Sequence, residues 1–244
     1  MLIKMTKPDK IGLIVAIALP LAAALWRAWY TFIYFADEPG SIVSEKTINR
    51  YGVDYFFQSQ DIPDTIFSLM QGKSYKEDCI VAREDLQYLV ILHRNLEGQA
   101  IVGEMVVNKL IATDVLDIMK LLFIQSYPIE KVRLIDYYDA DDEKSMSDNN
   151  TSCFNWRTKP NSATVSKHGM GMAIDINPLY NPYYKYERGK ETVQPEAGRP
   201  YLDRESAFPY KITANDLCHR LFEAHGFTWG GSWKSLKDYQ HFEK

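Results

Sequence analysis

The hydrophobic pattern in the first half of the chain predicts a β-hairpin. Residues 88–93 (YLVILH) and 100–107 (AIVGEMVV) are rich in β-branched and aliphatic side chains, as strands are. The segment between them, Asn95–Gly98, supplies turn residues. We therefore expect two adjacent antiparallel strands here.

Two later segments have the spacing of amphipathic helices. Residues 111–127 carry apolar side chains at positions 111, 115, 118, 119, 122 and 123, which share one helix face, and the proline that follows ends the helix. A second helix is expected from about 213 to 225. There Thr213 and Asp216 resemble a capping box, and Gly226 is a natural stop.

The other segments do not show a regular alternation of strand and helix. Residues 131–135 (KVRLI) predict a further strand, whereas residues 139–150 are polar and acidic and predict a surface loop. This mixture favours an α+β domain, with a small antiparallel sheet and flanking helices.

The N-terminus has a different character from the rest of the chain. Lysines at positions 4, 7 and 10 precede residues 11–26, which carry no charge, and after Arg27 the uncharged pattern resumes to residue 36. Residues 1–36 therefore predict a signal peptide or, as the favoured interpretation, an uncleaved membrane anchor helix. A buried helix of a soluble protein is the third possibility. Residues 37–75 then predict a stalk or lead-in, and 76–244 the folded domain.

Composition narrows the choice of partners and of redox chemistry. The 244 residues are 46% hydrophobic and 25% charged, which suits one globular domain with an appendage. A net charge of −4 without a basic run argues against nucleic acid as a partner. Cysteines 79, 153 and 218 form no CxxC pair. An odd number in an exported protein allows at most one internal disulfide with one free thiol, but the favoured interpretation is that all three are small core residues.

Two separate stretches offer the ligands of a catalytic zinc site. Residues 166–175 have the sequence SKHGMGMAID, and residues 238–243 have the sequence DYQHFE. Together they supply His168, Asp175 and His241, which leaves a fourth position on a tetrahedral Zn²⁺ for water.

Local structure explains how the first stretch would present its ligands. In a strand over residues 172–177, Ala173, Asp175 and Asn177 share a polar face, while the opposite face is apolar and predicts the core side. Gly169 and Gly171 permit a tight reversal that brings His168 back towards Asp175.

The second stretch predicts a turn around 238–240 that leads into a strand over 241–243. Residues three apart share a face in a helical turn, so Asp238 would lie beside the metal-bound water and act as general base. From the residues alone, ordinary structural roles stay open for all four. Among the other histidines, His93 is expected in the core and His225 at a helix C-terminus. Glu243 is either a support for a ligand histidine or an exposed strand end.

The combined motif, SxHxxGxAxD followed by [DE]xxH with Trp233 upstream, resembles the zinc D-alanyl-D-alanine carboxypeptidases and the related L-alanyl-D-glutamate endopeptidases. The resemblance extends over about 102–244. The flanking segments 148–157 and 176–178 are similar to the endopeptidase branch.

The resemblance implies a role for each matching position. His168, Asp175 and His241 would be the zinc ligands, Asp238 the catalytic base and Arg157 the group that stabilises the oxyanion. For Arg157 a surface ion pair is the alternative.

The resemblance also implies a substrate site. Ser166 would orient the site or the substrate, and Trp233 and Tyr239 would line the cleft. The alternatives are a turn residue for Ser166 and packing roles for the two aromatic residues.

The function implied is that of an exported, membrane-anchored zinc metallopeptidase. It would hydrolyse amide bonds in peptidoglycan stem peptides on the periplasmic or extracellular side. A catalytically silent cell-wall-binding module of the same fold is one alternative. A membrane-assembly protein with a structural zinc is another, although no fourth protein ligand is evident.

Overall fold

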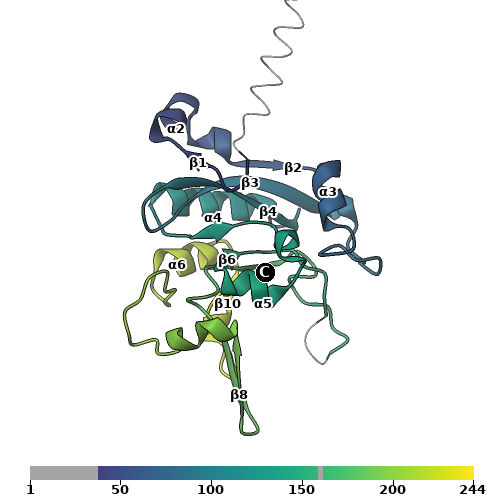
Figure 1. Ribbon diagram of the computed structural model, residues 1–244, viewed down its shortest axis with the longest axis vertical. Helices are drawn as coiled ribbons and strands as arrows, with labels where there is room; N and C mark the ends of the chain where they lie inside the picture. The colour runs from purple at the N-terminus through teal and green to yellow at the C-terminus, as the bar shows by residue number, and fades with distance from the viewer. Residues whose placement is uncertain (1–37, 159–161) are drawn as a thin grey trace, which may run out of the picture. The chain divides into compact units, whose positions relative to one another are not determined.

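The computed structural model describes residues 38–158 and 162–244 (Figure 1). The chain divides into two compact units, Met1–Glu38 and Pro39–Lys244, and the description below concerns the second. The predicted anchor or signal segment, residues 1–36, lies outside the described residues. Within the described part, no helix is both long and apolar enough to cross a membrane.

The largest sheet has four antiparallel strands in the order β1-β4-β3-β2. Its centre is the predicted hairpin of β3 (Leu86–Arg94) and β4 (Ala100–Asn108), paired along its whole length. The short strands β1 (Ile42–Val43) and β2 (Gln58–Gln60) form the two edges.

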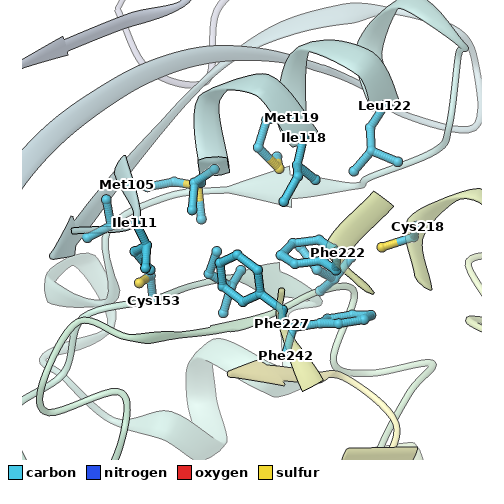
Figure 2. Packing of buried hydrophobic residues seen from close by; sticks show 14 of the residues in the cluster. Met105, Ile111, Ile118, Met119, Leu122, Cys153, Cys218, Phe222, Phe227 and Phe242 are labelled. Atoms are coloured by element: carbon cyan, nitrogen blue, oxygen red, sulfur yellow. The ribbon is translucent and has the colours of Figure 1, made fainter. Parts of the chain in front are cut away.

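Helix α4 (Ala112–Ile124) packs against this sheet and confirms the helix predicted from 111–127. Its apolar face is buried because it meets the sheet on one side and the C-terminal elements on the other. Figure 2 shows side chains of α4 directed towards Phe222 and Phe242.

The segment predicted as a stalk is folded onto the sheet from residue 39 onwards. Besides β1 and β2 it forms α2 (Glu45–Tyr51), η1 (Val53–Phe56) and α3 (Asp64–Met70). The stalk prediction is therefore wrong for residues 39–73. Their apolar residues occur in short groups, such as Ile42-Val43 and residues 55–57, that follow no clear helix or strand period, so the pattern does not reveal that Val43, Ile48 and Phe56 reach the core.

A second sheet carries the C-terminus, with antiparallel order β10-β12-β7. These strands are β10 (Thr228–Trp229), β12 (His241–Glu243) and β7 (Ala173–Asp175). Helix α6 (Leu217–Ala224) covers it, and the rings of Phe222 and Phe242 stack at 4.2 Å. Ile174 and Ile176 are fully buried, so the core face predicted for this strand is confirmed.

Two small sheets complete the unit. One has the order β11-β8-β9, formed by Lys237–Asp238, Tyr183–Glu187 and Lys190–Gln194. The other pairs β5 (Lys131–Val132) in parallel with β6 (Asn150–Thr151). The remaining short helices are η2 (Arg83–Asp85), η3 (Ile135–Tyr138), α5 (Asp142–Ser147), η4 (Glu196–Tyr201) and η5 (Gly230–Ser232).

Several local predictions need correction. The strand expected over 131–135 ends at Val132, and the loop expected over 139–150 contains α5, with Ser145 and Met146 buried. The second helix begins four residues later than Thr213. Its N-cap is Asp216, whose carboxylate accepts the His219 amide proton.

The fold class is α+β, as predicted, with small antiparallel sheets and several helices. The three cysteines, all in the described part, form no disulfide. Cys153 and Cys218 are buried in the core, and Cys79 is half-buried.

Candidate metal centre

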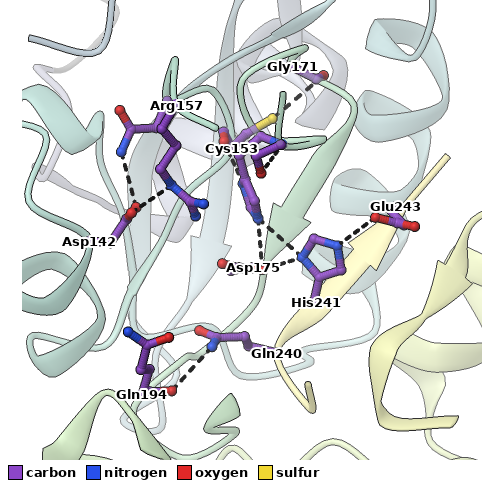
Figure 3. A network of polar contacts seen from close by, with 12 residues as sticks. Asp142, Cys153, Arg157, Gly171, Asp175, Gln194, Gln240, His241 and Glu243 are labelled. Atoms are coloured by element: carbon purple, nitrogen blue, oxygen red, sulfur yellow. Dashed lines mark hydrogen bonds and ion pairs between the residues drawn. The ribbon is translucent and has the colours of Figure 1, made fainter. Parts of the chain in front are cut away.

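The pairing of β7 with β12 brings the two distant motifs together. His241 lies directly opposite Asp175 in this antiparallel pair, and its Nδ1 is 3.0 Å from Asp175 Oδ1 (Figure 3). On its other side, Asp175 exchanges backbone hydrogen bonds with Ser152. The backbone that carries the Asp175 carboxylate is therefore paired on one side with β12 and on the other with Ser152.

His168 reaches the same point from a tight turn. Its backbone N–H donates to Ser166 Oγ at 3.2 Å, so Ser166 shapes this turn. Gly171 has φ +67°, and a Cβ there would lie 2.7 Å from the Asn108 nitrogen. Only glycine fits this backbone and this close approach, which explains the part of the motif between His168 and Asp175.

Three potential ligand atoms converge as a result. His168 Nε2 lies 3.1 Å from His241 Nδ1 and 3.2 Å from Asp175 Oδ1, and the third side of the triangle is the 3.0 Å contact above. Ligand atoms on a tetrahedral zinc ion lie about 3.3 Å apart, since the bonds to nitrogen and oxygen are about 2.0–2.1 Å. These residues therefore fit a divalent cation with little movement.

The second ring nitrogen of each histidine has a partner on its outer side. His168 Nδ1 is 2.7 Å from the Cys153 carbonyl oxygen, which can only accept, so Nδ1 is protonated and Nε2 is available as a ligand. His241 Nε2 is 3.1 Å from Glu243 Oε2.

The electrostatics of the cluster favour a positive charge at its centre. Burial raises the pKa of Asp175, but His168 and His241 outweigh it, and the pKa lies well below its usual range. Burial lowers the pKa of His241, but hydrogen bonds to Asp175 and Glu243 raise it to about 10. In the metal-free protein the raised pKa favours a proton on His241, and a divalent cation that binds at this position would displace that proton.

Asp238 lies close enough to interact electrostatically with the cluster, but it is not one of the three convergent residues. It lies in β11, where it pairs with Tyr183 of β8, so it is not in the predicted helical turn, although the strand over 241–243 is present. Gly230 allows its approach, since a Cβ there would lie 2.7 Å from the Asp238 carbonyl oxygen and 2.8 Å from its Cβ.

The Asp238 carboxyl has the properties that a general base requires. Its Oδ1 is buried and has no hydrogen-bond partner among residues 38–158 and 162–244. Burial raises its pKa and nearby Asp175 adds to this, while His241 and His168 lower it, with a result of about 7. A carboxylate with this pKa accepts a proton readily near neutral pH.

Arg157 contacts the turn of His168 through its backbone, and its side chain is held by an ion pair. Its Nε is 2.6 Å from Asp142 Oδ2 in α5, and its backbone oxygen accepts the Ser166 amide proton at 3.0 Å. The ion pair expected as the alternative is therefore present. The ion pair fixes the guanidinium against α5, while the backbone of Arg157 contacts the turn that carries His168. The oxyanion role stays a prediction.

The two aromatic residues predicted for the cleft lie in different places. The Trp233 ring is 5.5 Å from the His241 ring, so it borders the cluster. Tyr239 packs under the Arg204 guanidinium, 4.3 Å from its ring centre. It lines a pocket of about 420 Å³ together with Tyr184, Glu191, Leu202, Asp203 and Lys237.

The remaining polar residues of the motif regions have structural roles. Asn177, expected on the polar face of its strand with Asp175, donates to the Pro128 carbonyl and accepts from the Glu130 amide. His93 is buried against the Ile129 carbonyl, and burial lowers its pKa to about 4, which confirms it as a core residue.

Residues 160–244 match the family model described as D-alanyl-D-alanine carboxypeptidase. This finding confirms the resemblance inferred from the motifs, and it indicates a peptidase. The match includes the three convergent residues and Asp238, but it begins after Arg157 and is shorter than the expected 102–244. No solved structure matches the chain.

Proposed function

We propose that this chain, whose residues 160–244 match the D-alanyl-D-alanine carboxypeptidase family, is a zinc-dependent peptidase that cleaves amide bonds of peptidoglycan stem peptides. The observation that carries the proposal is the triangle of His168 Nε2, Asp175 Oδ1 and His241 Nδ1, with its sides of 3.0–3.2 Å. Three protein ligands leave one position open, as catalytic zinc sites do.

Two residues of the chain would take part in the reaction beside that ion, Asp238 as general base and Arg157 as the group that stabilises the oxyanion. When bound, Zn²⁺ would lower the pKa of a coordinated water and polarise the substrate carbonyl. Asp238, whose Oδ1 is buried without a hydrogen-bond partner in the described part of the chain, would take the proton from the attacking water and return it to the leaving amine. Arg157, steadied by Asp142, would stabilise the negative charge that develops on the carbonyl oxygen.

Two scissile bonds fit this chemistry. The segments 148–157 and 176–178 resemble the endopeptidase branch, so we favour the L-Ala-D-Glu bond over the terminal D-Ala-D-Ala bond. Both bonds occur in the same stem peptide, and the site chemistry is the same for either.

The proposed location follows from the substrate and from the N-terminal sequence. Peptidoglycan lies outside the cytoplasmic membrane, and residues 1–36 have the lysines and the uncharged segment of a signal anchor. The peptidase domain would then act on the periplasmic or extracellular side.

A silent wall-binding module is disfavoured by Asp238. A buried carboxyl oxygen without a partner destabilises a fold by about 1–3 kcal/mol, and a protein that only binds would have no use for it.

Product analysis with purified muropeptides tests the proposal. Loss of a terminal D-Ala and cleavage after L-Ala give products of different mass. We expect Asp238→Asn to keep its zinc and lose hydrolysis by about 10²–10⁴-fold, and His168→Ala to lose zinc. Stoichiometric zinc in His168→Ala would show that the ligand set is wrong, and full activity in Asp238→Asn would remove its role as base.

A further inference from the structure

Glu243 is in contact with the outer nitrogen of a candidate ligand. Its Oε2 lies 3.1 Å from His241 Nε2, on the side of the imidazole away from Asp175 (Figure 3). His241 and Glu243 are two residues apart in β12 and therefore share one face of the strand.

The backbone on both sides of Glu243 fixes this contact. Glu243 pairs with Ala173 of β7 and with Thr228 of β10, and its carbonyl oxygen accepts from Thr228 Oγ1 at 3.2 Å. The carboxylate is thus presented from the middle strand of the sheet and not from a free chain end.

The two histidines of the cluster are consequently supported in different ways. His168 would bind a cation through Nε2 while Nδ1–H donates to a neutral backbone carbonyl of Cys153. His241 would bind through Nδ1 while Nε2–H donates to a carboxylate. A charged acceptor makes the imidazole a stronger ligand than a neutral one does, and it also selects the tautomer.

We propose that Glu243 is a positioning residue that holds His241 in the tautomer and orientation in which Nδ1 faces the metal. This inference rests on the proposed function only in assuming that the cluster binds a cation. Glu243 cannot reach the same cation itself, because the imidazole ring lies between its carboxylate and Asp175. Its effect would be exerted through the histidine.

Metal affinity of the full chain tests this proposal without any need for substrate. Zn²⁺ dissociation constants of the wild type, Glu243→Gln and Glu243→Ala would be measured by competition with a chromophoric chelator. We expect binding about 10–100-fold weaker in Glu243→Ala. Glu243→Gln should lie between, because its amide oxygen can still accept from Nε2–H without the charge.

Glu187→Ala is the matched control. It removes a carboxylate from β8 that pairs with Lys185 at 2.7 Å, and its Zn²⁺ affinity should equal that of the wild type. Long-range ¹⁵N–¹H correlation spectra of the zinc-loaded proteins would report which nitrogen of His241 carries the proton, which a merely structural role would not change.

The outcomes separate this inference from the proposed function. Wild-type affinity in Glu243→Ala, with an unchanged His241 spectrum, would overturn the positioning role and leave the zinc peptidase proposal intact. Failure of the wild type to bind Zn²⁺ would overturn both.

Discussion

The ionised carboxylate of Asp238, the proposed general base, destabilises the folded protein. Its pKa is raised from 3.8 to about 7, chiefly by burial, so the folded protein binds more protons than the unfolded chain between these pH values. Stability then falls as pH rises through that window, and the cost is complete above pH 7. This is the opposite sign from a carboxylate held in an ion pair.

Asp238→Asn should therefore stabilise the metal-free protein in a pH-dependent way. Asparagine has nearly the shape of the protonated acid, so the gain should be smaller at pH 5, where only the lower part of the pH window from 3.8 to about 7 has been crossed. At pH 8 the substitution removes a buried charge and should raise Tm by a few degrees, since about 1 kcal/mol corresponds to about 2–4 °C for a protein of this size. Calorimetry in the presence of a chelator would measure both values.

An equal change of Tm at the two pH values would contradict this account of Asp238. Asp54→Asn, which alters an exposed carboxylate paired with Lys120, is the control and should show no such difference between pH 5 and pH 8.

For individual residues, the sequence predicted which side chains of the site meet, but not the groups that hydrogen-bond to them from outside the site. The glycines and the strand pattern between His168 and Asp175 are local signals and predicted that these two side chains meet, whereas His241 was added from the second motif and the family resemblance. The support for His168 is the Cys153 carbonyl, a group that every residue carries, so no residue type marks it. Asp142 beside Arg157 was likewise indistinguishable from other acids of its segment.

Among the elements, helix α6 shows how capping is decided by partners from outside the helix. Asp216 accepts from the His219 amide at 2.8 Å, and its other oxygen receives the Tyr127 hydroxyl at 3.0 Å. This oxygen also accepts from the Thr213 backbone N–H at 3.2 Å, one of the two hydrogen bonds of the expected capping box. Tyr127 follows α4, so a contact distant in sequence supports Asp216 as the N-cap of α6.

Asp216→Ala and Thr213→Ala should therefore differ in stability. Loss of an N-cap costs about 1–2 kcal/mol, and Asp216→Ala also removes the acceptor for Tyr127. Thr213→Ala should be close to neutral. Urea unfolding of the two variants would measure this, and a larger loss for Thr213→Ala would restore the predicted start of the helix.

The sequence predicted long elements better than short ones. β3, β4 and α4 contain enough residues to show a period, and they are present as expected. β11 has two residues and takes its hydrogen bonds from β8, more than fifty positions earlier. A strand of this kind has no local signal, which is why Asp238 was expected in a helical turn.

Gly230 connects the position of β11 to the proposed role of Asp238. A Cβ at this site would meet Asp238 backbone and side-chain atoms at less than 3 Å, so Gly230→Ala should displace Asp238 while β7 and β12 keep the metal ligands. We expect kcat to fall by about 10–100-fold, as for a misplaced catalytic group, with zinc content unchanged. Enzyme assays together with metal analysis would measure both.

Gly72→Ala is a suitable control for this substitution. A Cβ at Gly72 meets nothing within 4 Å, although its φ of +75° makes alanine strained. It should lower stability and leave kcat unchanged. Equal losses of kcat in both variants would attribute the effect of Gly230→Ala to general destabilisation.

For the whole molecule, the question is how far the folded unit extends towards the N-terminus. The edge strands β1 and β2 complete the large sheet, and Val43, Ile48 and Phe56 pack with Leu92 and other core residues of that sheet and of α4. The first sixty residues thus contain part of the core. The sequence could not indicate this, since these three residues lie in short segments without a clear helix or strand period.

Two N-terminal deletions should consequently behave differently. A chain that starts at residue 39 keeps the whole unit and should unfold cooperatively with high stability. A chain that starts at residue 61 loses three buried apolar side chains, each contributing about 1.5–3 kcal/mol, a sum comparable to the whole stability of about 5–15 kcal/mol of a typical domain. It also leaves both edges of β3 and β4 unpaired and the apolar surface around Leu92 exposed, so we expect aggregation or a low urea midpoint. Urea unfolding and size-exclusion chromatography would compare the two, and equal midpoints would mean that residues 39–60 are a stalk after all.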